Sequence, residues 1–136
     1  SIPNEGYENV YRFLLKDGRH FWTSSVSERN ALLNAGEKFE GIAWESPLAG
    51  EPIYRTYSSD GKHFWTKSLD EFKSLIKSGW RDEGTVWSSR NQTSGQVVYR
   101  LYNIKNGNHL FTSSSQEKST VLSNSEWRYE GVSWLN

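Results

Sequence analysis

In the N-terminal part of the chain, the hydrophobic pattern changes from the period of a strand to that of a helix and back again. Residues 11–15 and 20–24 are strand-like runs rich in aromatic residues, and the Asp-Gly pair at 17–18 is typical of a two-residue type I′ hairpin. The segment Ser25-Val-Ser-Glu28 fits the capping box that begins a helix, and another strand-like run follows at 39–45. The pattern therefore predicts a strand–turn–strand–helix–strand unit.

The same pattern occurs three times along the chain, which indicates an internal repeat. Each copy opens with Tyr-Arg and closes with Glu-Gly-x-x-Trp, at 40–44, 83–87 and 130–134. The third hairpin has one extra residue beside Asn106-Gly107, which predicts a longer loop. We predict one domain over 10–136 that follows a linker remnant at 1–9 and consists of three units, at 10–47, 53–89 and 98–136.

A two-residue loop would also determine which side chains share a face of each hairpin, because residues on paired strands alternate between the two faces. Counting outward from the predicted first turn places Phe13 opposite Trp22. On this count Arg12 lies on the other face, beside Thr23. The repeat then predicts a hydrogen-bonding strip of Arg and Thr side chains in every unit.

No single unit of this size can bury its hydrophobic surface alone, so the three units must share a core. A chain of 136 residues is long enough for such a core. The simplest solution is a pseudo-threefold closed arrangement of the α+β class. A β-trefoil is the alternative, since its repeats have a similar length, but the three capping boxes argue against an all-β repeat.

Composition supports an aromatic core and excludes several functions. The chain has seven Trp, seven Tyr and six Phe, so aromatic rings must fill much of the interior. Its 16 basic and 16 acidic residues balance, which argues against binding to nucleic acid or to a membrane. With no Cys there is no disulfide and no thiolate site. With no Met, the chain is expected to be a domain cut from a larger or processed protein.

The repeated carboxylates and one set of tryptophans are interpreted as structural. The capping box accounts for Glu28, Glu71 and Glu117. The Glu-Gly pair that begins at Glu40, with its two equivalents, indicates a β-bulge or a close approach of the backbone in the closing strand. The tryptophans that end the closing strands are expected in the core; they are Trp44, Trp87 and Trp134.

Several other repeated residues are candidates for ligand binding. They are the hairpin histidines His20, His63 and His109, the arginines Arg12, Arg55 and Arg100, and the tryptophans Trp22 and Trp65. Two further candidates, Trp80 and Trp127, follow the helix where the first unit has Glu37. A position that accepts either Trp or Glu is expected at the surface, and exposed rings usually indicate binding.

For the histidines and arginines, the sequence is compatible with either a structural or a ligand-binding role. A threefold axis could also bring three imidazoles together as a zinc site, but their spacing matches no metal motif, so no metal is predicted. The sequence contains no Gly-x-Ser-x-Gly, no His-Glu-x-x-His and no phosphate-binding loop. We therefore expect no catalytic residue, no cofactor and no enzymatic activity.

The segments Tyr-Arg-Leu-Tyr-Asn, Gly-Asn-His-Leu-Phe-Thr and Tyr-Glu-Gly-Val-Ser-Trp of the third unit resemble a three-copy repeat family long of unknown function. The resemblance covers residues 10–135 and weakens at Glu37, where the family favours Trp, and at Ser125-Glu126, where it favours Ala-Gly. Its members often lie C-terminal to peptidoglycan hydrolases, phage endolysins and bacteriolytic bacteriocins of Gram-positive bacteria, and they also occur on other secreted proteins. The resemblance implies a secreted domain at the bacterial cell wall, with a catalytic domain upstream in the same chain.

The leading prediction is a non-catalytic module that binds cell-wall polysaccharide or peptidoglycan. Sugars stack on aromatic rings and take hydrogen bonds from planar polar side chains, and three similar weak sites would gain avidity on a polymer. The alternative is a protein- or peptide-binding adhesion module. The sequence leaves open which wall polymer is bound and how many sites act.

Overall fold

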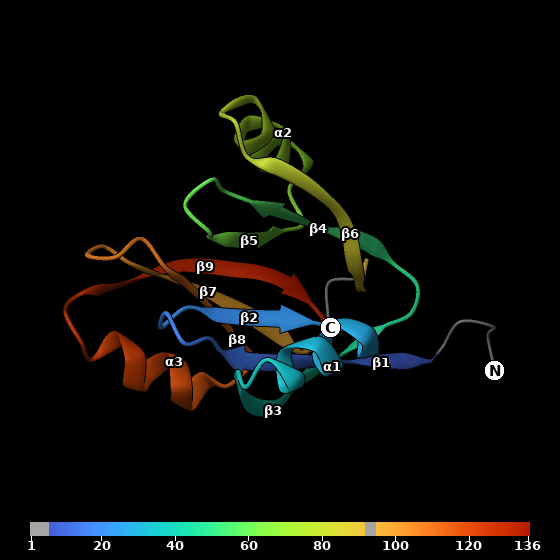
Figure 1. Cartoon of the computed structure of the whole chain (residues 1–136), viewed down its shortest axis with the longest axis horizontal. Coiled ribbons are helices and arrows are strands. Elements are labelled where there is room, and N and C mark those ends of the chain that lie inside the picture. Colours follow the sequence, from blue (N-terminus) through green and yellow to red (C-terminus); the bar gives the residue numbers. More distant parts are fainter. Residues whose placement is uncertain (1–5, 92–94) are drawn as a thin grey trace.

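The computed structural model describes residues 6–91 and 95–136, which form nine strands and three helices (Figure 1). In chain order these are β1 (Tyr7–Leu14), β2 (His20–Thr23), α1 (Val26–Asn34), β3 (Lys38–Pro47), β4 (Glu51–Tyr57), β5 (His63–Thr66), α2 (Leu69–Lys77), β6 (Arg81–Ser89), β7 (Val97–Asn103), β8 (His109–Thr112), α3 (Ser115–Leu122) and β9 (Trp127–Leu135). The first strand begins inside the predicted linker, of which residues 1–5 lie outside the described residues.

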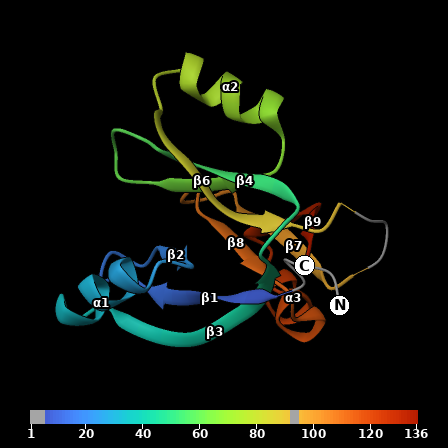
Figure 2. The same ribbon diagram turned by 90° about the vertical axis from the view of Figure 1, so that its right-hand side faces the viewer.

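Each unit is a three-stranded antiparallel sheet with its helix on the outside. The strand orders are β2-β1-β3, β5-β4-β6 and β8-β7-β9, and Figure 2 shows the three units set around a common centre. The predicted order of elements is confirmed, although the domain is richer in strand than a typical α+β fold. The described residues form no closed barrel, which separates this fold from the β-trefoil alternative. No helix in the described ranges is long and apolar enough to cross a membrane.

Aromatic rings from all three units fill the centre of the molecule, as the composition predicted. Trp22, Trp65 and Phe111 form one triad, with ring centroids 5.1, 5.3 and 5.9 Å apart. A second triad consists of one tryptophan from each closing strand, with centroids 6.0 Å apart in every pair: Trp44, Trp87 and Trp134. Edge-to-face contacts of this kind dominate both triads and add to the hydrophobic stabilisation of the buried rings.

The first hairpin loop begins one residue earlier than the sequence count placed it and spans three residues, 16–18. The Gly18 amide donates to the Leu15 carbonyl at 2.9 Å, and the Leu15 amide donates to the Arg19 carbonyl at 2.8 Å. Arg12 therefore pairs with Trp22, which places Arg12 on the same face as His20 and removes it from the face of Thr23. The predicted two-residue loop and the predicted strip of Arg and Thr side chains are wrong.

The bulges that the Glu-Gly pairs predicted are confirmed. Pairing between β1 and β3 shifts register opposite Gly41, whose φ of +94° is a left-handed conformation that favours glycine. Gly84 and Gly131 have φ of +80° and +100° at the equivalent positions. The bulge places the carboxylate of Glu40 beside the guanidinium of Arg12, with Oε1 2.9 Å from Nε.

Each helix is capped on one side of the predicted box only. The Glu71 amide donates to Ser68 Oγ at 3.1 Å, as a capping box requires. The Ser68 amide, however, donates to Thr66 Oγ1 at 3.0 Å instead of to the glutamate. The first and third helices repeat both contacts. The three glutamates are structural, but the capping box does not account for their carboxylates.

Candidate functional site

The freed carboxylates form ion pairs with arginines of the neighbouring unit. Glu28 of the first unit accepts two hydrogen bonds from Arg55 of the second, at 2.9 and 3.0 Å. Arg55 also donates from Nε to Glu83 of its own closing strand at 2.8 Å. Bidentate contacts of this kind are among the stronger charged hydrogen bonds, so this arginine joins two units.

The other two unit boundaries have the same arrangement. Arg12 contacts Glu117 at 2.7 and 3.0 Å, and Arg100 contacts Glu71 at 2.9 Å. Arg100 Nε also lies 2.9 Å from Glu130 Oε1, an ion pair without a well-aligned hydrogen bond. The structure thus places all three candidate arginines in ion pairs between units.

Each candidate histidine lies beside the glutamate of its own closing strand. The distances from Nε2 to Oε1 are 3.2 Å in His20–Glu40, 3.4 Å in His63–Glu83 and 2.9 Å in His109–Glu130. Burial, assisted by the charge of Arg55, lowers the pKa of His63 to about 4. Burial also lowers the pKa of His20 and of His109. The imidazole of His63 is therefore neutral near pH 7 and can both donate and accept a hydrogen bond.

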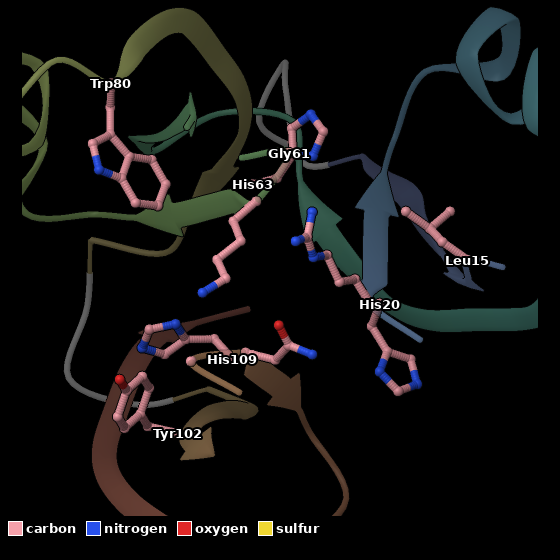
Figure 3. A pocket seen from close by; sticks show the side chains of 11 residues that line it. Leu15, His20, Gly61, His63, Trp80, Tyr102 and His109 are labelled. Carbon is pink, nitrogen blue, oxygen red and sulfur yellow. The ribbon is translucent and has the colours of Figure 1, made fainter. Parts of the chain in front are cut away.

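The three histidines also line one cavity, at the end of the molecule where the hairpin loops meet (Figure 3). We call this cavity of about 270 Å³ the axial pocket. Its lining consists of Leu15, Arg19, His20, Gly61, Lys62, His63, Trp80, Tyr102, Gly107, Asn108 and His109. In Figure 3, Trp80, Tyr102 and His109 lie on one side and Leu15 and His20 on the other.

The histidines do not form a metal site. Among residues 6–91 and 95–136, no group of three or more His, Asp or Glu side chains is arranged to hold a metal ion. Each imidazole instead packs against a ring of the neighbouring unit or of its own strands, as His63 does against Phe21 at 4.8 Å and Tyr57 at 4.5 Å between centroids. The histidines and the rings beside them are suited to contacting a ligand by stacking and by hydrogen bonds.

The two tryptophans that follow helices are half-buried, and so less exposed than the sequence suggested. Both Trp80 and Trp127 pack against the edge of the core. Trp80 also lines the axial pocket and an adjoining cavity of about 190 Å³, whose wall includes His109. In the first unit, Glu37 accepts a hydrogen bond from the Lys16 amide at 2.9 Å. Trp80 is thus the candidate ring that the structure brings together with the three histidines.

The other two candidate tryptophans lie in the core. Trp22 and Trp65 are 1% and 2% exposed and contact each other edge to face. A ligand at the surface cannot reach rings that are this deeply buried, so their assignment to a binding site is corrected to a packing role. Their burial comes from contacts between units, as in the packing of Trp22 against Trp65 and Phe111, which the pattern of a single hairpin does not indicate.

Seven of the eleven residues that line the pocket were not among the sequence candidates, and two of these seven carry a positive charge. Arg19 and Lys62 immediately precede the histidines of their hairpins, whereas the third unit has Asn108 at that position. This position is not part of the repeated motif because its residue differs between the units. The position could have been noticed by its charge, because two of the three units have a basic residue there.

Neither the curated proteins nor the solved structures contain a match to this chain. A family model does match it, over residues 5–136, a range that includes all three units and every residue that lines the axial pocket. That model describes a domain of unknown function, DUF5648, and the chain therefore belongs to the DUF5648 family.

Proposed function

We propose that this domain is a non-catalytic module that binds the glycan of the Gram-positive cell wall and holds a lytic enzyme of the same polypeptide there. The observation that carries the proposal is the axial pocket, which combines aromatic rings with several hydrogen-bonding side chains. Sugar rings stack their C–H faces on aromatic side chains, and their hydroxyl groups take hydrogen bonds from planar polar groups. The pocket supplies both kinds of contact.

The individual lining residues suit a polar, ring-shaped ligand. Trp80 and Tyr102 supply ring faces, and Asn108 supplies an amide that both donates and accepts. His63 stays neutral near pH 7 because burial lowers its pKa to about 4. A neutral imidazole can pair with a hydroxyl group in either direction, which is useful for binding a sugar.

The scaffold behind the pocket supports a preformed site. Ion pairs cross the boundary between the first and second units, the second and third, and the third and first. We include in the proposal that the three units close into a ring around the axial pocket. If the three hairpin loops are already fixed before binding, the entropic cost of ordering them on binding is smaller. The secreted location and the upstream catalytic domain belong to the same proposal and rest on the resemblance to the three-copy repeat family.

A retention assay with purified sacculi tests this function. The fluorescently labelled domain should remain with sacculi of Gram-positive bacteria, and Trp80→Ala should weaken retention severalfold. Trp127→Ala is the matched control, since Trp127 occupies the equivalent position and also packs against the core. The Trp127→Ala variant should be retained on sacculi better than the Trp80→Ala variant. Failure of the unsubstituted domain to bind sacculi from several species would overturn the proposal.

A second candidate function, binding of a protein or peptide, is favoured by exposed apolar residues on two closing strands. Phe39 and Ile42 are exposed on β3, and Tyr129 and Val132 are exposed at the equivalent positions of β9. Exposed apolar groups of this kind often mark protein interaction sites. Under this alternative, Ile42→Ser would abolish binding to intact cells while purified sacculi would bind neither form.

A further inference from the structure

The axial pocket has a definite charge, and this carries an inference that rests on the proposed function. Arg19 and Lys62 are the charged groups in its lining, and no carboxylate contributes to that lining. The rest of the lining consists of rings, glycines, an amide, an aliphatic side chain and imidazoles whose pKa burial lowers. Near pH 7 the pocket is therefore positive, although the chain as a whole has a formal net charge of zero.

Each of the two cations reaches from its own hairpin to the loop of the next unit. Arg19 Nη1 donates to the Asp60 carbonyl of the second hairpin at 2.9 Å. A Cβ atom at Gly61 would lie only 2.6 Å from that same nitrogen, and a Cβ at Gly107 would lie 2.6 Å from Lys62 Nζ. The glycines of the loops thus leave the room that the two cations occupy.

The nearest carboxylates neutralise these cations only weakly. Asp17 lies 3.7 Å from Arg19, and Asp60 lies 3.9 Å from Lys62. The carboxylate side chains are 52% and 63% exposed, whereas the cationic side chains are 25% and 27% exposed. Water screens exposed pairs of this kind strongly. The positive charge of the cations therefore remains available to a group that enters the pocket.

The three units supply different residues to the axial pocket, so the pocket is one site and not three equivalent sites. The third unit supplies Asn108 where the others supply a cation, and Trp80 is the pocket's single tryptophan. A volume of about 270 Å³ is below the roughly 300–1,000 Å³ of pockets for drug-sized ligands. The pocket is suited to one small unit of a polymer and not to a long stretch of chain.

We propose that the axial pocket binds the anionic group of a glycan, a phosphate or a carboxylate, between Arg19 and Lys62 while the adjoining sugar contacts Trp80. Guanidinium and ammonium groups bind both kinds of anion through charged hydrogen bonds. Wall polymers linked by phosphodiesters and wall polymers carrying free carboxylates are the two sources of this chemistry. The experiment separates them.

The histidines provide a reporter for this site, because the chain has only three and all of them line the pocket. Their ring-proton NMR signals should shift saturably at pH 7 on addition of glucose 6-phosphate or galacturonate, and much less with glucose. The double variant Arg19→Gln, Lys62→Gln should weaken the response to the anionic sugars by roughly tenfold for each lost cation.

Two further variants keep the test decisive. Arg19→Lys with Lys62→Arg retains both charges and should retain binding. Lys77→Gln with Lys105→Gln removes two exposed cations outside the pocket lining and should leave binding unchanged. Equal responses to glucose and glucose 6-phosphate, or full binding by the Arg19→Gln, Lys62→Gln variant, would overturn the inference.

Sacculi distinguish the source of the anion and separate this inference from the proposed function. Loss of retention after removal of the phosphodiester polymers identifies phosphate, and loss after amidation of the wall carboxylates identifies carboxylate. If the Arg19→Gln, Lys62→Gln variant stays on sacculi as well as the unsubstituted domain does, the anion inference fails and the glycan-binding function stands. If the unsubstituted domain binds no sacculi, the function itself fails.

Discussion

Replacing Arg55 with methionine should destabilise the whole domain, because this side chain connects the first two units. Its side chain is 11% exposed and makes three charged hydrogen bonds of 2.8–3.0 Å to Glu28 and Glu83. Its guanidinium also lies 5.1 Å from the ring centroid of Phe21. Methionine keeps much of the volume but leaves two partly buried carboxylates without their cation.

The magnitude follows from the burial of the three groups. Losing one partner of a fully buried ion pair costs about 3–5 kcal/mol, whereas an exposed pair contributes about 0.2–1 kcal/mol. The glutamates here are 33% and 21% exposed, which places the loss between these limits, at about 2–3 kcal/mol. For a domain of this size, that loss corresponds to about 8–10 °C in Tm.

Urea and thermal unfolding of the purified variant measure this loss directly. Arg81→Met is a suitable control, because Arg81 is exposed and its guanidinium lies over Tyr57 at 5.7 Å; it should cost less than about 1 kcal/mol. A double-mutant cycle with Glu28→Gln should give a coupling energy above about 1 kcal/mol. If Arg55→Met changes the free energy of unfolding no more than Arg81→Met does, the reasoning about the unit boundary is refuted.

Three further predictions concern pH, backbone conformation and helix capping. Because burial lowers the pKa of His63 from 6.5 to about 4, the unfolded chain binds the proton first. The resulting contribution to the free energy of unfolding is complete above pH 6.5 and decreases as the pH falls to 4, by at most about 3 kcal/mol. Urea unfolding across this range should show the slope, and His63→Gln should make it shallower, with the part due to His20 and His109 remaining. Gly84→Ala should cost about 1 kcal/mol in urea unfolding although no atom crowds the new methyl, because φ is +80°; an unchanged midpoint would contradict this. Ser68→Ala should cost about 1 kcal/mol through loss of the cap on α2, whereas the exposed Ser74→Ala should stay within about 0.5 kcal/mol.

The sequence predicted the local order of elements but not the hairpin register. An Asp-Gly pair suits both a two-residue turn and a longer turn that ends in a left-handed glycine, so residue types alone could not separate them. The choice changes which face of one strand lies beside a given face of the other. As a result the predicted strip placed Arg12 beside Thr23, whereas the structure places it on the face of His20. The burial of Trp22 has a different cause, because it depends on rings of the other two units.

The contacts between units could not be predicted from the sequence for a different reason. The Glu28 amide makes the predicted contact with Ser25, but nothing local indicates that the Glu28 carboxylate contacts Arg55 of the following unit. The repeat did predict a shared aromatic core, because that conclusion needs only the number and recurrence of the rings. Arg19 and Lys62 were not predicted as site residues because the third unit has Asn108 at their position, and a repeat indicates only the residues that all units share.

The ion pairs between units also bear on how such a domain can arise and change. In every unit the arginine pairs with the helix glutamate of one neighbour, and the helix glutamate pairs with the arginine of the other. With three copies, each of these arginines and glutamates therefore has a partner. A chain of two copies, or an open row of four, would expose an arginine at one end and a glutamate at the other. A gene that encoded a single copy could satisfy these contacts only as a homotrimer, from which duplication and fusion would yield the present single chain.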